Sequence, residues 1–245
     1  MWSAMIATAA PDRSRNQKAP ARLCTLSFPG PVGRLEAVLN EGHSDAPFVT
    51  LVCHPHPLGG GTLHNKVVYH AMKVFNDPAW GFALPVLRFN FRGTGLSQGV
   101  HDGNAEVGDV IAAMDWLENE YKLPLLVCGF SFGAAMALKA CCGVEASSHD
   151  VRAVAALGLP TEAQGRRYSY SFLAKSPIPK LFLSGDQDQF APAGQLAQIA
   201  ANACRPKTLL LVPGGDHFFQ GRLEQMQQTL HDWLLLNDRR KEQLQ

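Results

Sequence analysis

Short apolar runs alternate with longer amphipathic segments along most of the chain. Residues 48–53 are almost continuously apolar, which is typical of a strand buried on both faces. Residues 105–121 repeat apolar side chains every three or four positions, with the acidic residues mostly off that stripe, which predicts a helix. The same patterns predict further strands at 84–91, 123–128, 151–157, 180–184 and 208–212, and further helices at 65–75, 134–140, 193–203 and 219–236.

Strands that alternate with helices predict an α/β fold: a mostly parallel sheet with helices on both faces. Ahead of them, residues 23–28 and 34–40 are two strand-like runs joined by the turn signal Pro29-Gly30-Pro31, so an antiparallel hairpin should extend one edge. We expect a single domain over residues 22–240. The segment 158–179 is a candidate lid, too short for a separate cap domain.

The first 21 residues lack this alternation. Their apolar stretch, residues 2–10, comes before the basic residues Arg13, Arg15 and Lys18, which is the reverse of the order in a secretory signal. We therefore expect residues 1–21 to be a disordered tail, with an organelle-targeting segment as the alternative.

The composition and the net charge indicate which classes of binding partner to expect. Hydrophobic residues make up 46% of the chain and the net charge is +1, so nothing in the bulk charge favours nucleic acid or an anionic membrane. No apolar run approaches the ~20 residues of a membrane span. The six cysteines show no C-x-x-C spacing, which favours reduced thiols in a cytoplasmic protein over a disulfide framework.

The motif G-x-S-x-G at residues 129–133 lies between a predicted strand and a predicted helix. In that context the serine occupies a sharp, strained turn, a nucleophile elbow, with its hydroxyl exposed above the sheet edge. A serine hydroxyl needs a base to accept its proton and an acid to orient the base. The setting therefore predicts Ser131 as a nucleophile, and its base and acid are expected at the ends of other strands.

Candidates for the base and the acid follow later strands. His217 comes after strand 208–212, and Asp186 and Asp188 come after strand 180–184. Because the carboxyl ends of parallel strands converge at one edge, these side chains should approach the serine, in the chain order serine, aspartate, histidine. The residues alone leave the acid open between the two aspartates.

The oxyanion of an acyl-transfer intermediate needs hydrogen-bond donors placed in advance. The backbone N–H of Phe132, at the start of the predicted helix, is one candidate. The loop 54–61 (HPHPLGGG) should supply the second. Because prolines have no N–H, His56 is our first choice there and Leu58 the second.

Two other features have rival interpretations. His54 and His56 could bind zinc with His64 or a carboxylate as a third ligand, but the serine group explains the site without a metal, and we predict none. The Gly-rich turn after strand 84–91 lacks the G-K-[ST] ending of a phosphate loop, so Asn90 and Arg92 should instead hold this turn through hydrogen bonds. Three further histidines are expected at the surface: His101, His149 and His231.

Taken together, five segments resemble the α/β-hydrolase superfamily, in particular its small capless members of the dienelactone-hydrolase-like and serine-esterase group: HPHPLGGGTLHNKVV, LRFNFRGTGLSQG, GFSFG, SGDQDQFAP and PGGDHFFQGRL. The resemblance implies an α/β-hydrolase fold without a large cap domain. It also implies Ser131 as nucleophile, Asp188 as acid and His217 as base, with backbone donors near His56 and at Phe132.

These expectations predict a serine hydrolase that cleaves short acyl esters of small molecules through an acyl-enzyme, without a cofactor. An acyltransferase, an aminopeptidase or a non-catalytic binding protein on the same fold are the alternatives. An aminopeptidase needs acids to hold a free amine, and segment 158–179 offers only Glu162. Candidates for the wall of the substrate pocket are Leu58, Tyr168, Tyr170 and Phe172.

Overall fold

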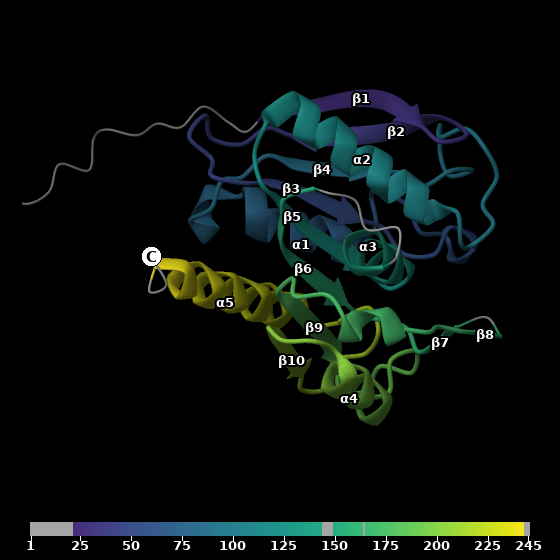
Figure 1. Cartoon of the computed structure of the whole chain (residues 1–245), viewed down its shortest axis with the longest axis vertical. Coiled ribbons are helices and arrows are strands. Elements are labelled where there is room, and N and C mark those ends of the chain that lie inside the picture. The colour runs from purple at the N-terminus through teal and green to yellow at the C-terminus, as the bar shows by residue number, and fades with distance from the viewer. Residues whose placement is uncertain (1–21, 144–148, 164, 243–245) are drawn as a thin grey trace, which may run out of the picture.

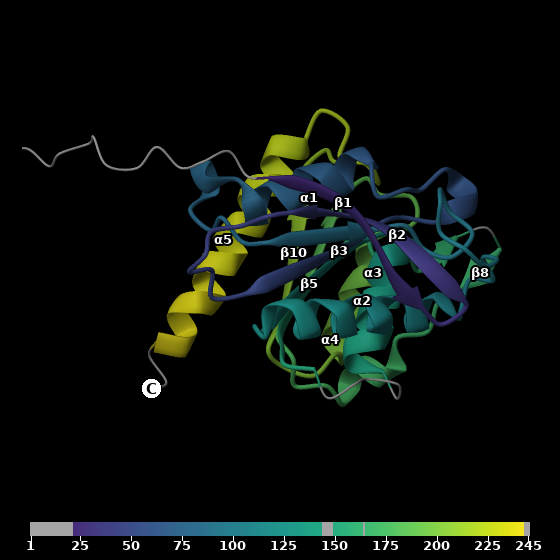
Figure 2. The same cartoon turned by 90° about the horizontal axis from the view of Figure 1, so that it is seen from above.

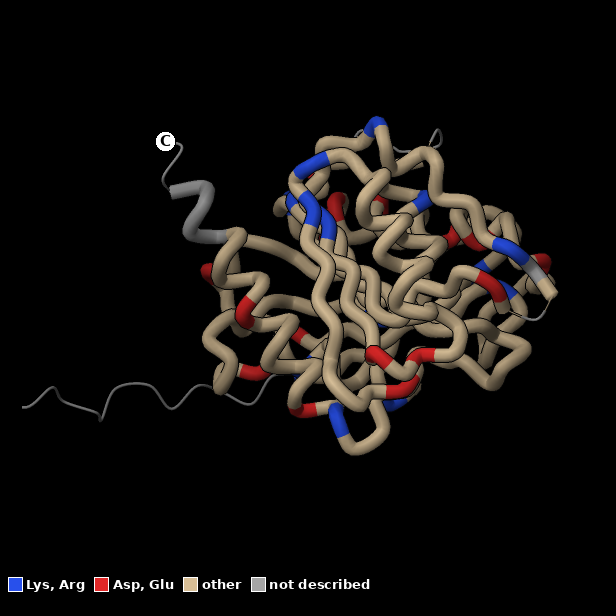
Figure 3. The backbone as a smooth tube through the Cα atoms, turned by 90° about the horizontal axis from the view of Figure 1, so that it is seen from below, with Lys and Arg blue, Asp and Glu red and all other residues tan. Residues whose placement is uncertain are grey.

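The computed structural model describes residues 22–143, 149–163 and 165–242 (Figure 1). The tail expected at residues 1–21 lies outside the described residues. Within these ranges, no helix combines the length and the hydropathy that crossing a bilayer requires. Basic and acidic residues both occur on the face shown in Figure 3, in keeping with a net charge of +1.

A mixed eight-stranded sheet forms the centre of the protein. The first two strands form the predicted hairpin, and β2 also pairs antiparallel with β4, whereas all later pairings are parallel. From one edge to the other the order is β1 (Leu23–Gly30), β2 (Gly33–Asn40), β4 (Val86–Phe89), β3 (Val49–Cys53), β5 (Leu125–Phe130), β6 (Val151–Leu157), β9 (Lys180–Gly185) and β10 (Lys207–Val212).

Helices cover both faces of the sheet, as Figures 1 and 2 show. One face carries α1 (Lys66–Asn76) and α5 (Leu223–Glu242), and the other carries α2 (Glu106–Tyr121), α3 (Phe132–Cys142) and α4 (Ala193–Asn202). Side chains alternate along each strand between the two cores: in β3, Leu51 packs with α2 and α3, and Val52 packs with α1. This is the predicted α/β-hydrolase architecture without a cap domain.

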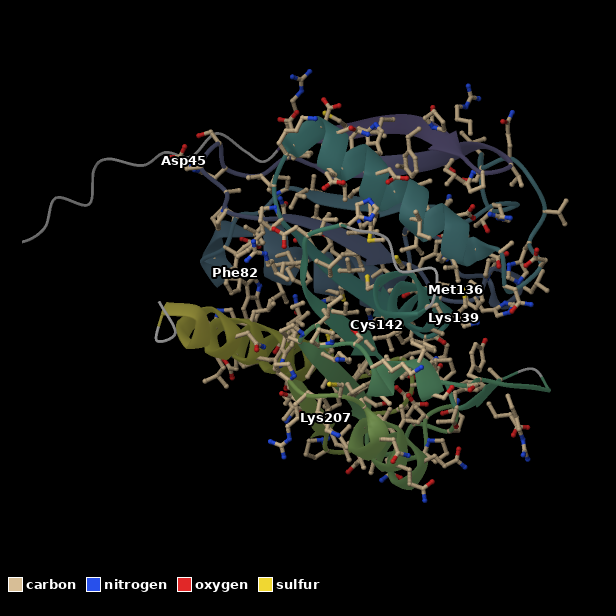
Figure 4. All side chains as sticks on the ribbon, in the orientation of Figure 1. Asp45, Phe82, Met136, Lys139, Cys142 and Lys207 are labelled. Carbon is tan, nitrogen blue, oxygen red and sulfur yellow. The ribbon has the colours of Figure 1, made fainter. Side chains whose placement is uncertain are left out.

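The helix α3 is nearly all buried because it lies under the centre of the sheet. Figure 4 labels Met136, Lys139 and Cys142 along it, and only the lysine of these three is partly exposed. All six cysteines are free thiols, as expected. Burial raises the pKa of Cys53, Cys128 and Cys141, which makes them inert packing residues rather than nucleophiles.

Most predicted elements are found with ends shifted by up to two residues, and two segments differ further from the sequence-based expectation. The segment 158–179 contains a small hairpin, β7 (Glu162–Ala163) with β8 (Arg166–Arg167), and the 3-10 helix η3 (Ser171–Ala174). The closing helix begins at Leu223 instead of residue 219, because Phe219 takes a φ of 53° and belongs to a turn.

Candidate active site

Ser131 lies on a tight turn between β5 and α3, at the carboxyl edge of the parallel strands. Its backbone has φ 55° and ψ −120°, a strained conformation for a residue with a side chain. The flanking glycines make the turn possible. A Cβ on Gly129 would lie 2.4 Å from the carbonyl oxygen of Gly133, and a Cβ on Gly133 would lie 2.4 Å from that of His54. The G-x-S-x-G spacing is therefore a steric requirement of this turn.

Three buried side chains from three strand ends meet at this turn. His217, after β10, has its Nε2 2.9 Å from Ser131 Oγ. Its Nδ1 lies 2.9 Å from Oδ2 and 3.0 Å from Oδ1 of Asp188, which follows β9. An ionised carboxylate can only accept, so Nδ1 carries the proton and Nε2 accepts the serine hydroxyl. The structure thus brings together the three residues predicted from the sequence.

The surroundings of Asp188 keep it charged. Burial alone disfavours the carboxylate, but hydrogen bonds from His217, from the Ser184 hydroxyl at 2.8 Å and from the Phe190 N–H at 2.8 Å hold the pKa of Asp188 below its ordinary value. Ala191 N–H adds a further bond at 3.0 Å. The carboxylate is therefore ionised at neutral pH and fixes the orientation of the imidazole.

Two neighbouring aspartates fasten the loops that carry this group. Asp186 Oδ1 accepts the N–H of Gly214 at 2.8 Å, which ties the loop after β9 to the loop after β10. Asp216 Oδ1 accepts the N–H groups of Phe218 and Gln220 at 3.1 and 2.8 Å, and so shapes the turn before α5. These contacts leave Asp188 as the aspartate that faces the imidazole.

The loop after β3 is held by a buried histidine. His54 Nδ1 lies 2.6 Å from the carbonyl oxygen of Pro55, and its Nε2 accepts the N–H of Phe91 at 3.0 Å. Burial lowers the pKa of His54 to about 4, so the ring is neutral. Because both ring nitrogens are engaged by the backbone, this geometry contradicts the alternative zinc site at His54 and His56.

This buried histidine should make stability depend on pH. An unfolded histidine titrates near pH 6.5, whereas folded His54 titrates at about 4, so its stabilising contribution is complete above pH 6.5 and is lost as the pH falls from 6.5 to 4. We expect the free energy of unfolding to lose about 2 kcal/mol more between pH 7 and pH 5 in the wild type than in His54→Gln. Urea unfolding at both pH values measures this difference. Equal losses of unfolding free energy in the two proteins would contradict the lowered pKa of His54.

Of the two candidates for the second oxyanion donor, the backbone N–H of His56 fits the structure better than that of Leu58. The N–H of Leu58 donates to His56 Nδ1 at 3.2 Å within the loop, and the Leu58 side chain is 76% exposed. His56 lines a cavity at Ser131, together with Phe132. Phe132 is the first residue of α3, where helical N–H groups have no partner within the helix. These two N–H groups remain our candidates for binding an oxyanion.

The cavity at Ser131 has a volume of about 130 Å³ and is lined mainly by aromatic and small side chains. Of the four residues predicted for its wall, the structure places only Tyr168 there. The Tyr170 hydroxyl donates to the Pro160 carbonyl at 2.7 Å, and Phe172 packs against the core with it, while Leu58 faces solvent. The residues lining the cavity are Pro55, His56, Gly59, Asn65, Ser131, Phe132, Ala163, Tyr168, Phe190, His217 and Phe218.

The Gly-rich turn after β4 has the structural role expected from the sequence. Asn90 accepts the N–H of Leu63 at 2.8 Å and donates to Glu36 at 2.7 Å, which braces the loop after β3. Arg92 pairs with Asp109 of α2 at 2.6 Å, and both side chains are buried. These bonds fix the turn against its two neighbours.

The sequence-based expectation for His101 and His149 was wrong, because their side chains are only 9% and 4% exposed. His101 matters for the site. Its Nδ1 lies 2.7 Å from a carboxylate oxygen of Glu106, and its ring contacts the His56 ring at a centroid distance of 4.7 Å. The sequence did not predict this pair, because the apolar pattern of α2 places Glu106 off the buried stripe. The structure shows instead that Glu106 is buried at the start of the helix.

Comparisons with known proteins agree with this architecture. The model of the alpha/beta hydrolase domain family matches residues 72–239. The uncharacterized protein RP471 of Rickettsia prowazekii is 36% identical over 218 residues, which cover 86% of this chain and 88% of that protein.

Solved structures are similar over nearly their whole length. An alpha-beta serine hydrolase homologue from Coxiella burnetii is 32% identical with a TM-score of 0.75, covering 86% of this chain and 96% of its own. XC6422 from Xanthomonas campestris, described as an a/b serine hydrolase without a lid, is 28% identical with a TM-score of 0.75, covering 92% of this chain and 97% of its own. The matched family model and the eight-stranded sheet without a lid show that this chain belongs to the alpha/beta hydrolase family.

Proposed function

We propose that the protein is a serine hydrolase that cleaves short acyl esters of small molecules through an acyl-enzyme. The observation that carries this proposal is the hydrogen-bonded series Ser131–His217–Asp188, with Oγ···Nε2 at 2.9 Å and Nδ1···Oδ2 at 2.9 Å, beside a small apolar cavity. A hydroxyl, an imidazole and an ionised carboxylate in this order are the parts that acyl transfer needs.

The reaction follows from these positions. Ser131 Oγ attacks the ester carbonyl carbon while its proton passes to His217 Nε2, and Asp188 stabilises the imidazolium that forms. The N–H groups of Phe132 and His56 bind the oxyanion of the tetrahedral intermediate. When the C–O bond breaks, the imidazolium returns the proton to the leaving alkoxide. Water then repeats the sequence on the acyl-enzyme and releases the carboxylic acid.

The cavity indicates which acyl group fits. Its volume of about 130 Å³ is slightly smaller than the ~150 Å³ of a protein cavity that holds benzene, which suits an acyl chain of a few carbons. Among the described residues that line it, none is charged, which favours an uncharged substrate. Glu162, the acid that an aminopeptidase could use, is absent from this lining and pairs with Arg167 at 3.3 Å. Both observations favour an esterase over an aminopeptidase.

A series of p-nitrophenyl esters from acetate to dodecanoate tests the proposal. We expect kcat/KM to be highest between acetate and butyrate and at least about tenfold lower for decanoate, because a methylene that a pocket cannot accommodate costs about 1–3 kcal/mol. Tyr168→Ala should move the optimum to longer chains, since this ring forms part of the wall. Highest activity on the longest esters would contradict the proposed acyl pocket, and no hydrolysis of any ester would contradict the proposed function.

A further inference from the structure

A buried histidine–glutamate pair lies behind the cavity. Glu106, the first residue of α2, is fully buried, and its Oε1 accepts the N–H of Asp102 at 3.0 Å. His101 Nδ1 lies 2.7 Å from the same oxygen. Within the described structure, neither the second oxygen of Glu106 nor His101 Nδ1 has a hydrogen-bond partner, so the contact between His101 and Glu106 is a close approach without hydrogen-bond geometry. The His101 ring is therefore packed directly against a buried carboxyl group.

The His101 ring is one corner of a cluster of three rings in edge-to-face contact. Its centroid lies 4.7 Å from that of His56 and 5.4 Å from that of Phe132, and the last two rings are 4.9 Å apart. His56 and Phe132 are the two residues whose N–H groups are our candidates for binding the oxyanion. They come from different elements, the loop after β3 and the start of α3. His101 therefore contacts both parts of the oxyanion site without lining the cavity itself.

We propose that His101, held by Glu106, is a positioning residue that sets the distance between the two oxyanion donors. The inference rests on the proposed function. The two donors share no strand or helix, so their separation depends on contacts between two segments. The backbone of Gly133 lies against the loop after β3, and the packed rings add the contact nearest the donors themselves. A displacement of about 1 Å in a catalytic arrangement can cost as much as 100-fold in rate.

The expected signature is a loss in kcat with little change in KM. The oxyanion exists in the transition state and not in the bound ester, so misplaced donors weaken only the transition state. We expect His101→Leu to lower kcat for p-nitrophenyl acetate by about 10- to 100-fold, with KM within about threefold of the wild type. The affinity for an alkyl trifluoromethyl ketone, whose adduct with Ser131 carries the same oxyanion, should fall by a similar factor.

A matched control is available at His149. This side chain is as buried as that of His101 and also pairs with an acid, Asp115, at 2.8 Å, but it precedes β6 at the opposite end of the strands. We expect His149→Leu to keep the wild-type kcat and inhibitor affinity. A loss of kcat in His149→Leu as large as that in His101→Leu would overturn the inference, because it would reflect general destabilisation.

A second variant covers the case in which His101→Leu does not fold, which its thermal unfolding curve would reveal. Glu106→Gln keeps the side-chain shape and the bond from Asp102, and it replaces the carboxyl group against which the His101 ring packs. We expect about a 3- to 10-fold loss in kcat with unchanged KM. Wild-type kcat and inhibitor affinity in the folded variants would overturn the positioning role and leave the proposed function intact. A wild type that hydrolyses no ester would instead overturn the proposed function and this inference with it.

Discussion

Ser131→Ala should lower kcat for p-nitrophenyl acetate by about a millionfold. Removing the nucleophile of a triad leaves only the contribution of binding and of the oxyanion donors. His217→Ala should cost about as much, since the hydroxyl 2.9 Å from its Nε2 would lose its base. The double variant should be no slower than either single variant, because the two side chains act as one unit.

Covalent labelling gives a second readout of the same prediction. A fluorophosphonate should modify the wild type once, on the peptide that contains Ser131, and should not modify Ser131→Ala. The matched control is Ser184→Ala. This serine is also buried at the site, but its hydroxyl donates to Asp188 at 2.8 Å instead of facing the imidazole. We expect Ser184→Ala to label normally and to lose no more than about 100-fold in kcat, because one hydrogen bond to a charged group contributes about 1.5–3 kcal/mol. Full hydrolysis by Ser131→Ala would contradict the mechanism, and a folded wild type that resists labelling would favour a non-catalytic binding protein.

Much of this site was predictable because its residues lie directly after strands that the sequence pattern identifies. The apolar runs that become β5, β9 and β10 are continuous and bounded by glycine, so the positions of Ser131 and His217 relative to the sheet edge followed directly. Parallel pairing then dictates that the ends of these strands meet. The choice of Asp188 over Asp186 came from the family resemblance, and the geometry agrees with it.

What sequence patterns missed depends on contacts between distant segments. The hairpin of β7 and β8 has two residues in each strand, too few to show an alternating pattern. Glu106 and Asp109 face away from the apolar stripe of α2 and are nevertheless fully buried, because His101 and Arg92 cover them from a loop that the helical pattern does not describe. The wall of the cavity was likewise misjudged at Tyr170, whose hydroxyl finds a carbonyl in the core.

The buried pair between Arg92 and Asp109 should dominate the stability of the turn after β4. The guanidinium contacts Asp109 through Nε at 3.0 Å and Nη2 at 2.6 Å, and the backbone N–H of Arg92 adds a bond at 3.0 Å. Asp109 is 0% exposed, so removing the arginine side chain leaves a buried carboxylate without its cation. We expect Arg92→Leu to lower the free energy of unfolding by about 3–5 kcal/mol, measured by urea unfolding at pH 7.

An exposed ion pair of the same type provides the control. Arg152 contacts Asp150 at 2.5 Å, but the two side chains are 42% and 55% exposed, so Arg152→Leu should change stability by about 1 kcal/mol or less. The double variant Arg92→Leu/Asp109→Leu separates the charge from the packing. Most of the cost of Arg92→Leu comes from the carboxylate left behind, so the double variant should be more stable than the single one. If Arg92→Leu is no less stable than Arg152→Leu, the pair is not what holds this turn against α2. The support of the loop beside the nucleophile would then have to come from Asn90, whose bonds to Leu63 and Glu36 reach the same segment from its other side.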